Sequence, residues 1–570
     1  LVTVHAPETQ RPGIYEGDVV VTARGHKPWP VRLRVRVWDF VLPRASFLRT
    51  CFQLMPGYLA RYHDVWDGRT PPGWHLGTWV GADIQGIPNY FGYAEYQNGV
   101  TEENVLSGKH CAWISCTTWQ PGERETPRAA LMCDLTLQPG RYRFQVAYRM
   151  DDRTTVADMG VSAAGWRGLE PSTEWRRADM DFTIAEEGKV YLYLRLLSKG
   201  KVFFDEVSIT DAEGKELVPN PGFDHIPAHT TETLLDKYRL DMLAHRASDM
   251  NVAAPTVEVE GDMVRLDWKD FDRLMARYIA LGQNAFNIYW ARVPGGWGSV
   301  AGLGDEQQRK ISAEILRQTQ AHLSEKGWLD LAYLYVIDEP GAAAFPAVQQ
   351  VFDFVHSAAP GIKRLLTYGY GATLPREPGR PKYAELAGYV DIHVPHSDCF
   401  DAEYLRARQK LGEEVWAYVC ISAQRPYLNI WGIDYPGTDP RVLFWQLHRF
   451  GITGFLYWAI NYWEKDPWKD PMTYPGGNAD GSLLYPGRDG PVDSLRWELT
   501  RDGIEDYDYL ELARRKAASL RAAGKAAPAA KLEALYHADE VTSDWKQYTE
   551  EPQVIMAHRR KLAEALSAAK

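Results

Sequence analysis

Cysteine is scarce in this sequence. Its 570 residues include six cysteines, and no two of them form a CxxC pair. Zinc ribbons and dithiol redox motifs are therefore not indicated. Cys111 and Cys116 are near enough in the chain to pair, although buried free thiols are the commoner outcome. The sequence predicts no metal site and no cofactor.

Long apolar runs and excess positive charge are also missing. No segment approaches the roughly 18 apolar residues that a membrane span requires. The net charge is −11, and no basic stripe is present to neutralise phosphates, which argues against nucleic acid as a partner. The chain opens on LVTVHAPETQ, which is typical of a strand rather than a signal peptide.

Aromatic residues are plentiful, with 21 Trp and 31 Tyr. Flat rings with a polar edge suit the apolar faces of sugars, but they are equally at home in large β-rich cores. Composition alone leaves both interpretations open.

Two kinds of periodicity divide the chain. Residues 1–43 contain the alternating runs GDVVVTARG and VRLRVRVWDF, which predict an N-terminal β-sandwich that lacks some of its strands. From 229 to 512, apolar runs alternate with helical patterns, which indicates a parallel sheet covered by helices. Seven strands can be counted from MNVAAPTVEV (250–259) onward, whereas a closed (β/α)8 barrel needs eight.

The missing first strand is assigned to SFLRTCFQL at 46–54, within the segment 44–59. Residues 60–228 then become an insertion in the first βα loop. Its alternating runs, such as RYRFQVAYRM and KVYLYLRLLS, predict a jelly-roll β-sandwich that resembles a carbohydrate-binding module. The Ala-rich residues 513–570 predict C-terminal helices. The expected fold is thus α/β: a (β/α)8 TIM-like barrel preceded by one β-sandwich and interrupted by another.

One pair of adjacent acids stands out by its context. The dipeptide Asp-Glu occurs four times, so the pairing itself is weak evidence. Only Asp338-Glu339, in LAYLYVIDEPG, ends a central barrel strand, and barrel enzymes place catalytic groups at such strand ends. The alternative is a strand-end pair that caps a neighbouring helix.

Adjacent acids suggest a particular glycosidase chemistry. Most glycosidases place two carboxylates on opposite sides of the scissile bond, about 5 Å apart or more. Neighbouring residues just before Pro340 would instead turn toward one side of a sugar. This arrangement suits substrate-assisted hydrolysis, in which the sugar's 2-acetamido oxygen attacks the anomeric carbon. Glu339 would be the acid and base, and Asp338 would hold the acetamido N–H.

Five motifs carry a family resemblance: VWDFVLP (37–43), IDEP (337–340), GFLYWAINYW (454–463), DGSLLYPG (480–487) and LTRDGIEDYDYLEL (499–512). With them the chain resembles glycoside hydrolase family 123, the β-N-acetylgalactosaminidases, and related bacterial proteins. The resemblance implies that Asp338 and Glu339 are the catalytic pair and that a β-sandwich precedes the barrel. It also implies a bacterial protein, for which secreted and periplasmic locations both remain open.

Other strand ends supply candidate substrate-binding residues. Tyr418 is a candidate donor to the acetamido carbonyl, and aromatic or polar side chains elsewhere could line the pocket or belong to the barrel core. These further candidates are Asn287, Trp290, Tyr368, Tyr370, His393, His396, Tyr457, Trp458, Asn461 and Trp463.

Three functions are compatible with the sequence. The first is an exo-acting β-N-acetylgalactosaminidase whose partner is a glycan ending in GalNAc. The second is a β-N-acetylglucosaminidase with the same mechanism, because the two sugars differ only at the 4-hydroxyl. The third is a sugar-binding protein with an inactive barrel, against which the intact acids argue.

Overall fold

The computed structural model describes residues 3–569 except 64, 67–69, 79–91, 122–128, 227–228, 261–262, 298–302, 305 and 370–380. The chain forms two compact units. The first combines Leu1–Leu59 with Lys237–Lys570, and the second is Ala60–Asp236. Among the described helices, none has the length and apolar character to cross a bilayer.

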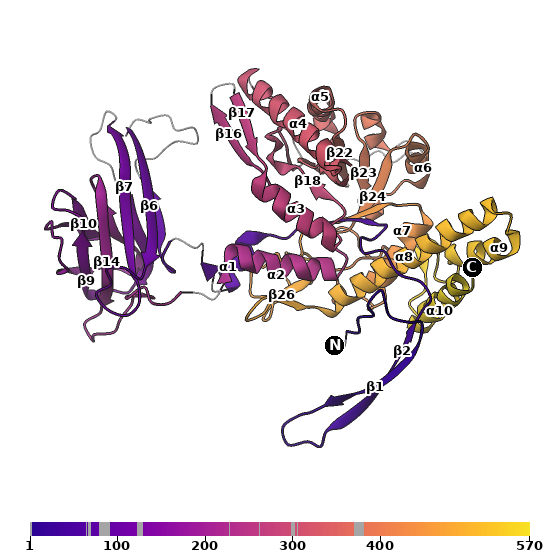
Figure 1. Cartoon of the computed structure of the whole chain (residues 1–570), viewed down its shortest axis with the longest axis horizontal. Helices are drawn as coiled ribbons and strands as arrows, with labels where there is room; N and C mark the ends of the chain where they lie inside the picture. Colours follow the sequence, from indigo (N-terminus) through magenta and orange to yellow (C-terminus); the bar gives the residue numbers. More distant parts are fainter. Residues whose placement is uncertain are drawn as a thin grey trace. The chain divides into compact units, whose positions relative to one another are not determined.

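The second unit consists of two five-stranded antiparallel sheets (Figure 1). One sheet has the order β11 (Gly165–Leu169), β10 (Ala157–Val161), β13 (Gly188–Leu196), β8 (Ala129–Leu137) and β5 (His75–Thr78). The other has the order β12 (Arg176–Ile184), β9 (Gly140–Met150), β14 (Gly200–Thr210), β7 (Cys111–Pro121) and β6 (Gly92–Thr101). Alternate residues of both sheets, including Leu131, Phe144 and Leu194, share one buried cluster, as in a β-sandwich. The sandwich is confirmed, whereas its jelly-roll topology stays a prediction.

The first unit contains a seven-stranded parallel sheet that is nearly closed. Its order is β18 (Phe286–Asn287), β20 (Ala332–Leu334), β22 (Lys363–Tyr368), β23 (Ile392–Pro395), β24 (Glu414–Tyr418), β25 (Gly454–Tyr457) and β3 (Arg49–Phe52). The segment around Met250 spans the remaining gap. Its N–H donates to the Phe52 carbonyl (2.8 Å), and its carbonyl accepts from the Asn287 N–H (2.9 Å). The mixed α/β class and a barrel-like sheet are therefore confirmed.

Two details differ from the expectation. The predicted strand at 250–259 touches the barrel only around Met250, and the chain then forms a separate hairpin of β16 (Thr256–Glu260) and β17 (Met263–Asp267). Pro255 lies between these two parts. Within residues 3–43 the structure describes one hairpin, β1 (Gly13–Val21) with β2 (Trp29–Val37), rather than a sandwich.

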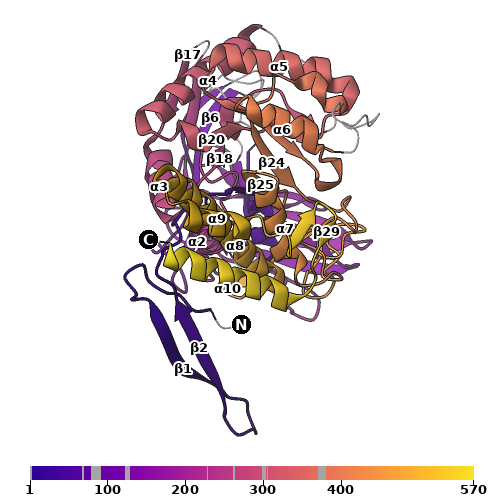
Figure 2. The ribbon, with the colours of Figure 1, turned by 90° about the vertical axis from the view of Figure 1, so that its right-hand side faces the viewer.

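Alternation along the strands separates an inner from an outer core. Cys51, Tyr333, Leu365 and Tyr418 form the cluster inside the barrel. Residues of the opposite strand faces, such as Phe286, pack against helices on the outside. These helices are α2 (Thr231–Ala244), α3 (Lys269–Leu281), α4 (Glu306–Lys326), α5 (Phe345–Ala358), α6 (Ala402–Lys410) and α7 (Asp439–Arg449), arranged around the sheet in Figure 2.

A long helix, α8 (Leu495–Ala522), is followed by α9 (Ala526–Tyr536) and α10 (Pro552–Ala568). The predicted boundary between barrel and tail at 512 thus lies inside α8. Because α8 carries the motif LTRDGIEDYDYLEL, its contacts show what this motif does.

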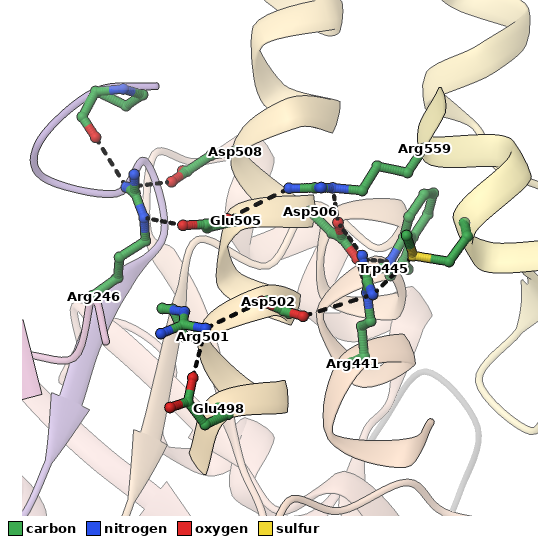
Figure 3. Close-up of polar contacts among 12 residues, drawn as sticks. Arg246, Arg441, Trp445, Glu498, Arg501, Asp502, Glu505, Asp506, Asp508 and Arg559 are labelled. Carbon is green, nitrogen blue, oxygen red and sulfur yellow. Dashed lines mark hydrogen bonds and ion pairs between the residues drawn. The ribbon is translucent and has the colours of Figure 1, made fainter. Parts of the chain in front are cut away.

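The acids of α8 form a network of buried ion pairs (Figure 3). Asp508 accepts hydrogen bonds from the Ser46 hydroxyl and the Phe47 N–H, both at 2.8 Å, and pairs with Arg246 at 3.0 Å. Asp506 accepts from Arg441 of α7 at 2.6 Å and pairs with Arg559 of α10 at 2.7 Å. This part of the motif therefore holds the start of β3 and the neighbouring helices in place.

Candidate active site

The paired acids lie where the fourth barrel strand is deflected. After β20, the chain passes through Tyr335 and Val336 and continues as β21 (Ile337–Asp338), which pairs in parallel with β19 (Gly296–Trp297). The Val336 carbonyl accepts from the Gly296 N–H at 2.9 Å. Gly295 makes this approach possible, since a Cβ there would lie 1.9 Å from the Val336 oxygen. The strand thus leaves the regular sheet just before the acids.

Glu339 has a left-handed backbone, with φ at 44°. Such a conformation costs a non-glycine residue on the order of 1–3 kcal/mol and is concentrated at functional sites. The Glu339 N–H donates to the Thr367 hydroxyl at 2.9 Å, which helps to hold this conformation. The turn directs Glu339 differently from an ordinary strand residue, for which alternation would send it away from Asp338.

Asp338 is held by two hydroxyl donors. Its Oδ1 accepts hydrogen bonds from the Tyr335 hydroxyl at 2.7 Å and the Thr367 hydroxyl at 2.8 Å. Thr367 therefore donates to one acid while accepting from the backbone of the other. This single hydroxyl on β22 fixes the two acids relative to each other.

Glu339 is positioned by Tyr418 and Gly369. The Tyr418 hydroxyl donates to Glu339 Oε1, and burial, with a further contribution from the Glu339 charge, raises the pKa of Tyr418 well above its ordinary value. Tyr418 consequently stays protonated and remains a donor. A Cβ on Gly369 would lie 2.7 Å from the Glu339 carboxyl carbon, so this glycine leaves room for the carboxylate.

His396 supports Tyr418 from the side, with ring centroids 4.8 Å apart. Its Nε2 accepts from the Cys420 N–H at 3.0 Å, and its Nδ1 lies 2.7 Å from Asp398 Oδ1. Since Nε2 is an acceptor, the proton is on Nδ1 and is donated to Asp398. His396 is thus a positioning residue for Tyr418.

An aromatic cluster lies within electrostatic reach of Glu339. Trp458, Tyr462 and Tyr474 have ring centroids 5.0–5.9 Å apart. Trp458 Nε1 donates to Asp480 at 2.9 Å, which fixes its ring. Burial raises the pKa of Tyr474, and the charge of Glu339 contributes to the same shift. These rings are suited to contact the apolar face of a sugar.

Six of the other candidates have structural partners away from the acids. Trp290 packs between helices and donates to the Thr319 hydroxyl at 3.2 Å. Tyr368 and His393 face outward from their strands and bond to each other at 2.8 Å. Asn461 binds both backbone groups of Met55. The remaining two are also buried: Tyr457 bonds to Asp480, and Trp463 donates to the Leu484 carbonyl. These placements favour structural roles over direct substrate contact.

Asn287 differs from those six because it touches the segment that leads to the acids. Its side-chain oxygen accepts from the Tyr335 N–H at 2.8 Å, and its amide donates to the Tyr335 carbonyl at 3.1 Å. Asn287 therefore positions Tyr335, which in turn holds Asp338. Tyr370 lies outside the described residues.

Sequence reasoning missed Tyr335, Thr367, Gly369 and Tyr474. Thr367 was detectable, because it alternates with Leu365 on the inner face of β22. Tyr335 lies in the same apolar run as the acids, where it looks like another core residue. Tyr474 follows a long irregular segment and has no pattern that would identify it.

Comparisons with known proteins match one stretch of the chain to a family. Residues 296–513, which include both acids, match the family model described as glycoside hydrolase 123, catalytic domain. This stretch is therefore a glycoside hydrolase catalytic domain. The resemblance to family 123 is thereby confirmed. No curated protein matches the chain in sequence.

Three similar solved structures share 11–12% of their sequence with this chain. A family 123 glycoside hydrolase from Clostridium perfringens, solved to examine glycolipid glycan hydrolysis, is 12% identical, with 78% of this chain and 92% of that chain covered and a TM-score of 0.40. The CBM22-1–GH10 modules of a Clostridium thermocellum xylanase are 11% identical, with coverage of 77% and 96% and a TM-score of 0.28. TmCBM61, in complex with β-1,4-galactotriose, is 12% identical, with coverage of 26% and 98% and a TM-score of 0.19.

Proposed function

We propose that this glycoside hydrolase releases terminal β-linked N-acetylgalactosamine by substrate-assisted, retaining hydrolysis. The observation that carries the proposal is the Thr367 hydroxyl, which donates to Asp338 and accepts from the Glu339 N–H. It holds the two acids side by side, whereas a direct double displacement needs carboxylates on both sides of the bond.

In the first step the 2-acetamido oxygen of the substrate attacks C1, and the bond to the leaving oxygen breaks. Glu339 gives its proton to that oxygen, and an oxazolinium ion forms. Asp338 accepts a hydrogen bond from the acetamido N–H and stabilises the positive charge on the oxazolinium ring. Water then attacks C1, Glu339 takes its proton, and the acetamido group is restored with retained configuration.

Tyr418 fits the role of a donor to this acetamido group. Its hydroxyl is held beside Glu339 and stays protonated. We propose that it turns from Glu339 to the acetamido oxygen when substrate is bound. Trp458 and Tyr474 would then contact the apolar face of the sugar.

Two substitutions test the assignment of roles. Glu339→Gln should abolish cleavage of natural glycosides but leave more activity on nitrophenyl glycosides, whose leaving group needs no proton. Asp338→Asn should slow the cleavage of both substrates to the same extent, because Asp338 is proposed to act on the acetamido group that both contain. Glu306→Gln is the control, since Glu306 begins α4 and pairs with Lys310. An equal loss on both substrates for Glu339→Gln would contradict the general-acid role.

The sugar is tested separately. Nitrophenyl β-glycosides of GalNAc and GlcNAc differ only at the 4-hydroxyl, and the galactoside lacks the 2-acetamido group. A thiazoline analogue mimics the oxazolinium ion. Turnover of GalNAc with inhibition by the thiazoline is expected. Preference for GlcNAc would favour the second candidate enzyme, and turnover of galactose would exclude substrate assistance.

We further propose that the second unit binds glycans through the outer face of one sheet. Trp166 of β11 is 48% exposed and lies over Gly160, where a Cβ would be 2.2 Å from the ring. The Arg195 guanidinium lies 3.2 Å from the ring centroid and is paired with Asp158, and the Tyr193 ring is 4.9 Å away. A flat, supported and exposed indole is a stacking surface for a sugar.

Binding of the whole protein to immobilised or soluble glycans tests this second proposal. Trp166→Ala should weaken retention on a glycan while leaving turnover of a nitrophenyl substrate unchanged. Trp29→Ala is the control, because Trp29 is 72% exposed on the β1–β2 hairpin. Equal retention of the Trp166 variant and the control would refute the stacking surface.

A further inference from the structure

A second cluster of acids lies outside the barrel, between α2 and the start of α8. It contains Asp241 of α2, His245 directly after the end of that helix, Asp493 at the end of β27 (Pro491–Asp493) and Glu498 of α8. One potential ligand atom from each of Asp241, His245 and Asp493 lies within 4.8 Å of the others. Within the described residues, no other group of three or more such side chains meets this condition.

The imidazole of His245 is aimed into this cluster. His245 is only 4% exposed. Its Nδ1 lies 2.9 Å from the Asp241 backbone carbonyl, which accepts hydrogen bonds but cannot donate them, so Nδ1 carries the proton. The unprotonated Nε2 then has no hydrogen-bond partner. It lies 4.0 Å from Asp493 Oδ2 and 3.9 Å from Glu498 Oε1.

The lone pair of His245 Nε2 therefore faces the carboxylates of Asp493 and Glu498. All three atoms are acceptors, and their mutual contact is unfavourable unless a proton or a metal cation lies between them. Asp493 Oδ1 is also buried without a hydrogen-bond partner. Arg501 is the nearby positive side chain, and it pairs with Glu498 at 2.5 Å (Figure 3). The cluster therefore has more negative than positive charge.

We propose that Asp241, His245 and Asp493 bind a divalent transition-metal ion, with Zn²⁺ as the best match. An imidazole nitrogen with two carboxylates is a donor set for Zn²⁺, whose ligands lie about 2.0–2.2 Å from the metal. Metal-binding histidines commonly donate their other N–H to a backbone carbonyl, as His245 does to Asp241. Glu498 is placed to accept a bond from a metal-bound water.

The site is separate from the paired acids. The His245 ring stacks on Trp497, at 5.1 Å between centroids, and Trp497 contacts Phe52 on the outer face of β3. Cys51, next in the chain, faces the inside of the barrel. A metal here would join the end of α2 to β27, with α8 linked only through Glu498 and a metal-bound water, and its role would be structural.

Metal content of the whole protein tests the proposal. Protein treated with a chelator and then dialysed against Zn²⁺ should retain about one ion per chain by mass spectrometry and melt at a higher temperature than the metal-free form. Co²⁺ in place of Zn²⁺ should give visible absorption bands of a low-symmetry site. His245→Gln and Asp493→Asn should each abolish retention of the ion.

His448→Gln provides the matched control, because His448 is likewise a buried histidine that faces an acid, Glu511, at 3.5 Å. It should keep the metal. Retention of Zn²⁺ by His245→Gln would overturn the site, as would wild-type protein that binds no divalent ion and melts identically with and without it. Should the variants fail to fold, the wild-type melting shift and the Co²⁺ spectrum still decide.

Discussion

The hydroxyl of Tyr335 offers the sharpest test of how Asp338 is held. Tyr335→Phe removes one of two hydrogen bonds to Asp338 Oδ1, at 2.7 Å, and leaves the Thr367 bond at 2.8 Å. A hydrogen bond to a charged group contributes about 1.5–3 kcal/mol. If this contribution is fully expressed in the transition state, kcat/KM should fall by roughly 10- to 150-fold.

The pattern across substrates should distinguish Asp338 from Glu339. The Tyr335 hydroxyl donates directly to Asp338, the residue that is proposed to act on the acetamido group, so the loss should be equal for nitrophenyl GalNAc and for a natural GalNAc glycoside. The assay is initial-rate kinetics on both substrates with the same enzyme preparation. A loss confined to the natural glycoside would mean that Tyr335 acts through the general acid instead.

Tyr333 of β20 provides a control two residues earlier in the chain. It is buried inside the same barrel core, and its hydroxyl donates to Cys51 Sγ at 2.8 Å. Tyr333→Phe should leave kcat/KM within about twofold of wild type, since it removes no contact with either acid. The reasoning would be refuted if Tyr335→Phe were equally harmless, or if both variants lost the same activity.

Three further predictions concern neighbouring parts of the molecule. Gly369→Ala should displace the Glu339 carboxylate and lower kcat more than tenfold (about 1.4 kcal/mol) without unfolding the protein. Gly437→Ala is the control and should leave kcat unchanged, because its Cβ would lie 3.6 Å from Leu499. Burial lowers the pKa of His393 from its ordinary 6.5, so the unfolded chain binds that proton more tightly. Stability should then be complete above about pH 6.5 and fall toward the folded pKa by up to about 1.4 kcal/mol per pH unit, and His393→Gln should flatten this dependence in melting curves. Asp508→Ala should cost about 3–5 kcal/mol of unfolding free energy, because the Ser46 hydroxyl and the Phe47 N–H lose their acceptor and Arg246 keeps only its longer pair with Glu505, at 3.5 Å. Asp502→Ala, on a more exposed pair at 3.8 Å, should cost under about 1 kcal/mol in urea titrations.

The position of the paired acids could be predicted because it depends on a local pattern. An apolar run that ends on Asp338 and Glu339 and is broken by Pro340 indicates a strand end. The same pattern carries no information on the left-handed turn at Glu339, because that conformation depends on Thr367 and Tyr418, which are distant in sequence. The deflection of β21 toward β19 is likewise a tertiary effect.

Aromatic residues at strand ends were harder to assign. Trp458 and Trp463 belong to the same motif, yet one joins the aromatic cluster near Glu339 and the other is buried against the Leu484 carbonyl. Nothing in residue type or spacing separates them. The strand predicted at 250–259 shows a related difficulty. An apolar run does not reveal whether its backbone hydrogen bonds go to the barrel sheet or to the next segment of the chain in a separate hairpin.

The hold of α8 on β3 has a consequence for how the chain folds during its synthesis. β3 ends at Phe52, but its sheet partner β25 is synthesised about 400 residues later and its anchor Asp508 about 460 residues later. At about 5–20 residues per second, these intervals are roughly 20–90 s. All strands of the second unit are synthesised well before β25 and Asp508, so this unit can fold first. During that time β3 has no neighbouring strand in the sheet. Chains that terminate before Asp508 should therefore retain a folded sandwich joined to an open, protease-sensitive barrel.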